Sequence, residues 1–240
     1  MRQDRFFINS KIKVGKATIV DKEIAFQLKK VLRKKRGDKI FIFNNEQTEA
    51  TAKIENILNE KIDINILEIY QNKNEPFLYV RLYCSILKKN NFEWMVQKTT
   101  EIGVKEIIPL VCGNTVKLGL NSIRLRKIIK EAAEQAGRGV IPLLREPLSF
   151  QEALYSSQSS DLKIIFDKGG ESINTLKSLK EIKPTNLSIF IGPEGGWKKE
   201  EIELAKKEEM KVINLGKLTL RAETAALIAS FLVVNIFEIT

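Results

Sequence analysis

The chain contains no histidine and only two cysteines, the side chains on which much nucleophilic and metal chemistry depends. Without histidine, no Ser–His or Cys–His catalytic pair and no histidine-ligated metal site can form. Cys84 and Cys112 lack CxxC spacing, so they carry no metal or redox signature and suit a reducing compartment. We therefore predict that both cysteines are small core residues and that no metal is bound.

The chain also lacks a hydrophobic run long enough to cross a bilayer, and Met1–Arg5 shows no signal-peptide core. Hydrophobic residues make up 43% of the chain and charged residues 29%, which is typical of soluble globular proteins. These features predict a cytoplasmic protein with no membrane partner.

Positive charge is in excess, because 40 lysines and arginines oppose 30 acidic residues and give a net charge of +10. Such a balance is consistent with a polyanionic partner such as nucleic acid, although lysine-rich genomes produce it as well. The densest basic run is Lys29–Lys39. It suits either a solvated helix end, where cations complement the dipole, or a phosphate-binding patch with steep salt dependence.

The predicted pattern of strands and helices changes once along the chain, near residue 70. Up to about residue 70, short β-rich segments with one helix at about 23–33 predict a small β-barrel. From Phe77 onward, strands alternate with helices, which predicts an α/β domain with a parallel sheet covered on both faces. The polar segment Gln71–Pro76 is the predicted linker, so the expected domains are 1–72 and 73–240.

Two glycine-bearing segments follow short apolar runs in the second domain, Ile191–Trp197 and Leu215–Ala226. Neither has a Walker A or GxGxxG pattern, which disfavours a nucleoside triphosphate or a dinucleotide. They are either two tight turns or two parts of one pocket, because ligands bind outside the carboxyl ends of parallel strands. In a pocket, glycine would let backbone N–H and C=O groups approach the ligand closely.

These two segments, Ile191-Gly192-Pro193-Glu194-Gly195-Gly196 and Leu215-Gly216 through Leu220-Arg221-Ala222-Glu223-Thr224-Ala225, resemble the knotted SPOUT-class RNA methyltransferases. The closer resemblance is to the RsmE family of 16S ribosomal RNA uridine-N3 methyltransferases, and it covers nearly the whole chain. Further matching stretches are Val31-Leu32-Arg33, Gln97–Val104 and Glu131–Arg138. One departure is that the family's usual histidine before the Val-Leu-Arg segment is absent, since that region here reads Ala25-Phe26-Gln27-Leu28.

The resemblance implies a PUA-like N-terminal barrel and a C-terminal SPOUT domain with a deep trefoil knot. It also implies a homodimer, and the apolar C-terminal helix from Ala225 to Ile239 is our candidate for part of the interface. S-adenosylmethionine is the implied cofactor, and 16S ribosomal RNA within the small ribosomal subunit is the implied substrate. The cofactor-binding residues expected are Ile191, Gly192, Glu194, Gly195, Gly196, Leu215, Gly216, Leu218, Leu220, Thr224 and Ala225.

Methylation of uridine N3 requires loss of the N3 proton, and the chain has no histidine to accept it. We favour an arginine that stabilises the uridine anion, Arg221 or Arg138, with Glu223 as the third catalytic candidate. Arg221 and Glu223 could equally form a plain surface ion pair at a helix start. The predicted RNA-binding residues are Arg2, Arg5, Arg33, Lys34, Lys35 and Arg36.

Two alternative functions stay open at this point. The first is another SPOUT reaction, such as methylation of a ribose 2′-oxygen. The second is a catalytically silent RNA-binding protein of ribosome assembly. The intact glycine segments and Arg221 favour an enzyme over the silent protein.

Overall fold

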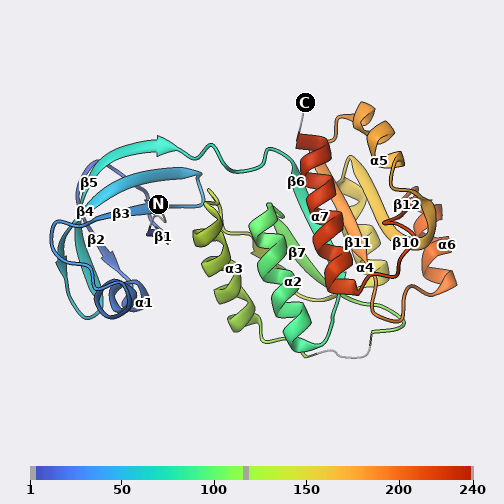
Figure 1. The fold of residues 1–240 in the computed structure, drawn as a ribbon, viewed down its shortest axis with the longest axis horizontal. Coiled ribbons are helices and arrows are strands. Elements are labelled where there is room, and N and C mark those ends of the chain that lie inside the picture. The colour runs from blue at the N-terminus through green and yellow to red at the C-terminus, as the bar shows by residue number, and fades with distance from the viewer. Residues whose placement is uncertain (1–3, 116–118, 239–240) are drawn as a thin grey trace. The chain divides into compact units, whose positions relative to one another are not determined.

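The computed structural model describes residues 4–115 and 119–238, and Arg2 lies outside these ranges (Figure 1). The chain forms two compact units. The first contains the residues up to Glu75 together with Ala133–Ile141, and the second contains Pro76–Ala132 and the residues from Pro142 onward. The return of Ala133–Ile141 to the first unit has no signal in the strand and helix pattern of the sequence.

The first unit is built on a five-stranded sheet with the order β1-β3-β4-β5-β2. Its strands are β1 (Arg5–Phe7), β2 (Gly15–Val20), β3 (Lys39–Phe43), β4 (Thr48–Ile57) and β5 (Lys61–Gln71). Strands β1 and β3 run parallel, whereas the other neighbours are antiparallel. The alternation of Ile62, Ile64 and Ile66 buries all three side chains, as expected for a strand with one face on the core.

The helix of the first unit is shorter than the pattern predicted. Helix α1 (Lys22–Phe26) begins at Asp21, whose carboxylate accepts hydrogen bonds from the backbone of Glu23 and Ile24. The chain then widens into a π-helical turn, Gln27–Val31. It does not continue as a helix to residue 33, because Arg33 adopts a left-handed φ of 52°.

The second unit contains a sheet in which every recorded pairing is parallel. The order is β12-β10-β11-β6-β7-β8, with the short β9 paired to β7. The strands are β6 (Tyr79–Ser85), β7 (Glu106–Val111), β8 (Leu143–Leu144), β9 (Leu148–Ser149), β10 (Leu162–Ser172), β11 (Asn186–Ile191) and β12 (Lys211–Asn214). This arrangement confirms the predicted parallel α/β sheet and adds β8 and β9.

Helices alternate with these strands as predicted. They are α2 (Lys89–Ile102), α3 (Ser122–Ala136), α4 (Phe150–Ser156), α5 (Thr175–Ser178), α6 (Lys199–Lys207) and α7 (Ala222–Glu238). Helix α7 packs against α2 and against β6 and β11, and Figure 1 shows α7 and α2 side by side. Across the part of the chain that the structure describes, none of the helices has the length and apolar character needed to span a bilayer.

A group of buried charges attaches the segment Ala133–Ile141 to the rest of the first unit. Arg138 donates two hydrogen bonds to Glu75, from Nε to Oε2 at 2.9 Å and from Nη2 to Oε1 at 2.6 Å. Arg5 pairs with Glu49 and donates to the carbonyl oxygen of Arg138 at 3.0 Å. Asn72 donates to Glu49 and to the carbonyl oxygen of Gly137.

These contacts involve two arginines that the sequence analysis proposed as site residues. The side chains of Arg5 and Arg138 are only 8% and 3% exposed, and both face carboxylates within the first unit. Both arginines therefore form buried ion pairs, and the RNA-binding role of Arg5 and the catalytic role of Arg138 stay predictions. Buried arginines need a partner because an unpaired charge in the interior is strongly destabilising.

We predict that Glu75→Gln destabilises the protein by about 3–5 kcal/mol, because it leaves the buried guanidinium of Arg138 without a counter-charge. Glu203→Gln is the matched control, since Glu203 pairs with Lys206 at an exposed position and should cost about 0–1 kcal/mol. Thermal and denaturant unfolding of both variants would measure the difference. Equal losses would show that the Glu75–Arg138 pair is not a structural anchor.

Candidate functional site

A pocket of about 470 Å³ opens at the carboxyl ends of β11 and β12 and beside the residues of β10 that follow Phe166. The parallel register of these three strands brings the three segments to one edge of the sheet. The lining residues are Phe166–Lys168, Ile191–Trp197, Asn214, Leu215, Leu218–Ala222 and Ala225.

The pocket gathers both glycine segments identified in the sequence. All of the expected cofactor-binding residues line it except Gly216 and Thr224. Gly216 lies within the same turn, where its N–H donates to the side chain of Asn214 at 2.7 Å. Thr224 follows on helix α7 and is partly buried. The hypothesis of one shared pocket therefore fits the geometry better than two unrelated turns.

The first glycine segment, Gly192–Trp197, is a tight turn braced by an aromatic ring. The N–H of Gly196 donates to the carbonyl of Pro193 at 2.9 Å, and Gly196 adopts a left-handed φ of 71°. The Trp197 indole donates to the carbonyl of Phe166 at 3.0 Å. A Cβ on Gly192 would lie 2.9 Å from the Trp197 ring, so only glycine allows this packing.

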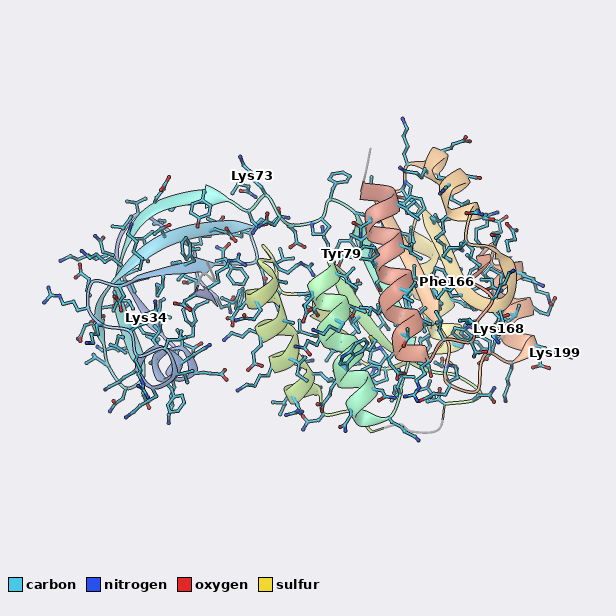
Figure 2. All side chains as sticks on the ribbon, viewed as in Figure 1. Lys34, Lys73, Tyr79, Phe166, Lys168 and Lys199 are labelled. Carbon is cyan, nitrogen blue, oxygen red and sulfur yellow. The ribbon has the colours of Figure 1, made fainter. Side chains whose placement is uncertain are left out.

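A third segment of the pocket comes from β10 and was not identified from the sequence. The pairing of β10 with β12 shifts register between Phe166 and Glu171, which bulges the residues between them out of the ladder. Lys168, which is labelled in Figure 2, lies in this bulge and donates a hydrogen bond to the hydroxyl of Thr219. The signal available was the run Asp167-Lys168-Gly169-Gly170, a further glycine-bearing turn at a predicted strand end.

Asn214 couples the bulge to the second glycine segment. Its Nδ2 donates to the carbonyl of Lys168 at 2.6 Å, while its Oδ1 accepts from Gly216 at 2.7 Å. One amide thus holds two walls of the pocket at a fixed separation. Asn214 was not predicted from the sequence, because a lone asparagine at a strand end carries no distinctive pattern.

Two of the three catalytic candidates, Arg221 and Glu223, occupy different environments at this edge. Arg221 is exposed and lines the pocket, whereas Glu223 is buried in the first turn of α7. Among the described residues the two form no ion pair, and Glu223 Oε2 has no hydrogen-bond partner. The simple surface ion pair considered from the sequence is therefore absent here.

The two cysteines are buried, as predicted for core residues. Burial raises the pKa of Cys112 to about 12, which keeps the thiol protonated and unreactive. Burial is also the largest cause of the raised pKa of Cys84, with smaller contributions from Cys112 and from the carboxylates of Glu194 and Glu223. Those carboxylates therefore act on the carboxyl end of β6, beside the pocket segments.

The other predicted RNA-binding residues lie in the first unit, between the π-helical turn and β3. Lys34 (labelled in Figure 2), Lys35 and Arg36 line a hollow of about 820 Å³, whereas Arg33 is exposed but outside its lining. The other lining residues are Lys16, Ala17, Thr18, Lys29, Glu55, Asn56, Ile57, Asp63 and Ile64. Five cations thus share one hollow with two carboxylates, and Lys34 also pairs with Asp4 at 2.7 Å.

Comparison with known proteins identifies the family of both units. The RNA methyltransferase domain family matches residues 73–234, and the RNA methyltransferase PUA domain matches residues 20–67. The chain belongs to the RNA methyltransferase family. The match confirms the resemblance drawn from the glycine segments, and it covers both units.

Individual relatives of this family agree over nearly the full chain. Ribosomal RNA small subunit methyltransferase E of Buchnera aphidicola subsp. Acyrthosiphon pisum is 32% identical, over 94% of this chain and 90% of its own length. The protein of the same name from Mesomycoplasma hyopneumoniae is 31% identical, over 93% and 95%. The crystal structure of the Neisseria gonorrhoeae enzyme of that name, bound to S-adenosyl methionine, is 27% identical with a TM-score of 0.86, covering 95% of each chain.

We predict that Gly192→Ala disrupts the first wall of the pocket, because its Cβ would displace the Trp197 ring from the carbonyl of Phe166. In a Trp94→Phe background, which leaves Trp197 as the one tryptophan, the emission should shift to the red and stability should fall by about 1–3 kcal/mol. Gly119→Ala serves as the control, since a Cβ there meets nothing within 4 Å. Unchanged emission in Gly192→Ala would contradict this packing.

Proposed function

We propose that the protein transfers the methyl group of S-adenosylmethionine to N3 of a uridine in 16S ribosomal RNA of the small subunit. The observation that carries this proposal is a pocket built from three backbone segments in a chain that belongs to the RNA methyltransferase family. The related Neisseria gonorrhoeae enzyme, which bears a small-subunit methyltransferase name, was solved with this cofactor bound.

The pocket has the chemistry that the cofactor requires. Adenine presents hydrogen-bonding edges and two flat apolar faces. Leu215, Leu218 and Leu220 supply apolar walls, while the glycine segments offer backbone N–H and C=O groups. The cofactor supplies an electrophilic methyl group when it is bound.

The chain's own charged groups serve the nucleobase. During transfer a bond forms between uridine N3 and the methyl carbon, the carbon–sulfur bond breaks, and the N3 proton must leave. Arg221 lines the pocket as an exposed cation and stabilises the negative charge that develops on the uridine. Glu223, with its buried and unpartnered Oε2, is the candidate to accept the proton. Because N3 lies on the pairing edge, the target base must be unpaired or flipped out.

The remaining parts of the proposal concern RNA and assembly. The basic hollow of the first unit, including Lys34, Lys35 and Arg36, is suited to RNA phosphates.

Helix α7 presents a partly exposed apolar face that is suited to a second copy of the chain in a homodimer. That face consists of Leu227, Ile228, Phe231, Leu232 and Ile236. A trefoil knot in the second unit and a cytoplasmic location complete the proposal, on the strength of the family resemblance.

The function is tested by incubating the purified protein with labelled S-adenosylmethionine and small ribosomal subunits that lack methyl marks. Mass spectrometry of the nucleosides should find label in N3-methyluridine. Label in a 2′-O-methyl nucleoside would keep the enzyme class and contradict the chemistry. No label and no cofactor binding would favour the silent RNA-binding protein instead.

We further predict that Arg221→Ala lowers turnover by about 10²-fold or more while cofactor affinity stays near normal, since Arg221 acts on the developing charge. Lys217→Ala is the matched control, because Lys217 is a cation of the same segment that does not line the pocket. Single-turnover rates and calorimetric titration would separate the two effects. Normal turnover in Arg221→Ala would eliminate this role.

A further inference from the structure

The first glycine segment is held from outside the pocket by a turn that follows β7. Asn114, in this turn, directs its side-chain amide at two consecutive backbone carbonyls of the segment. Nδ2 donates to the carbonyl of Gly196 at 3.0 Å and to that of Gly195 at 3.4 Å. An amide nitrogen carries two hydrogens, so both bonds can be made at once.

The turn that presents Asn114 is itself fixed. The backbone N–H of Thr115 donates to the carbonyl of Cys112 at 3.0 Å, and the Thr115 hydroxyl accepts from the N–H of Cys112 at 2.8 Å. The same hydroxyl bonds to Ser85, a fully buried residue at the end of β6, at 3.0 Å. The turn that contains Asn114 is therefore anchored to the ends of β6 and β7, the two strands that follow β11 in the sheet order.

A second brace comes from Glu201 in helix α6. Its Oε1 accepts from the N–H of Gly113 at 2.8 Å, and its Oε2 accepts from the N–H of Lys198 at 2.7 Å. One carboxylate thus joins the Asn114 turn to the residue that follows Trp197. The glycine segment is tied on both sides to elements that do not line the pocket.

The carbonyls of Gly195 and Gly196 need such support, because glycine backbones rotate freely and both residues are solvent-accessible. Among the described residues, Asn114 is the one side chain that donates to these two carbonyls. We propose that Asn114 is a positioning residue that fixes the peptide planes of Gly195 and Gly196, and with them one wall of the pocket, before a ligand arrives. For the identity of that ligand, S-adenosylmethionine, the inference rests on the proposed function.

The consequence is preorganisation. A wall that is already in place adds little ordering cost when the ligand binds, whereas a loose wall must be ordered at the expense of affinity. Asn114 touches no reacting atom in this scheme, so its loss weakens ligand binding and leaves the chemical step intact once the pocket is filled. This pattern distinguishes a positioning residue from one that merely stabilises the fold.

The test uses Asn114→Asp, which keeps the size of the side chain and removes both donors. Asn186→Asp is the matched control, because the Asn186 amide donates to the carbonyl of Ser159 at the opposite end of β11. In both variants of the full chain, hydrogen exchange of the segment 192–197, the Kd for S-adenosylmethionine, and kcat and KM with small subunits are measured. Melting temperatures accompany each variant.

Asn114→Asp should speed exchange in the segment and raise Kd and KM for S-adenosylmethionine by about tenfold, the effect of one or two hydrogen bonds. At saturating cofactor, kcat should stay within about twofold of the unchanged protein, and the control should leave Kd within the same range. Asn114→Ala should behave like Asn114→Asp. This provides a second reading if the aspartate perturbs folding.

The proposal is overturned if exchange and KM are unchanged in Asn114→Asp, or if kcat falls while KM does not. Equal losses of affinity in the control would overturn it as well, since they would reflect general destabilisation. Failure of the unchanged protein to bind S-adenosylmethionine would instead refute the proposed function. The exchange comparison alone would then still decide whether Asn114 holds the segment.

Discussion

The parallel alignment of β10, β11 and β12 is the constraint on which the pocket depends. Parallel strands end at the same edge of a sheet, so the segments after Phe166, Ile191 and Asn214 meet although long stretches of chain separate them. Each segment turns sharply there and exposes backbone groups that the sheet no longer pairs. The position of the pocket is therefore set by the order and register of these strands.

The shape of the pocket depends on the residues that hold its three backbone segments in place. Trp197 bonds the first glycine segment to the carbonyl of Phe166 in β10, and Asn214 bonds the bulge to the second glycine segment. Asn114 bonds the first glycine segment from outside the pocket. Such contacts are short and directional, so they restrict the position of each wall.

The first unit contains both buried, ion-paired arginines and accessible cations. Arg5 and Arg138 look like surface cations in a basic chain, yet the fold encloses them against Glu49 and Glu75. Lys34, Lys35 and Arg36 stay accessible because the π-helical turn and the left-handed Arg33 lead the chain out along the surface. Composition counts both groups alike, since it carries no information on which carboxylate each cation will meet.

Local pattern in the sequence determined the change from a β-rich to an alternating α/β segment near residue 70, the parallel α/β class of the second unit, and the two glycine segments that line its pocket. These features depend on periodicity and on turn residues, which act over a few positions. Tertiary structure alone decided the bulge at Lys168, the amide contacts of Asn114 and Asn214, and the interior places of Arg5 and Arg138. Each of these depends on partners far away along the chain, and only the register of the folded strands and the docking of Ala133–Ile141 bring those partners together.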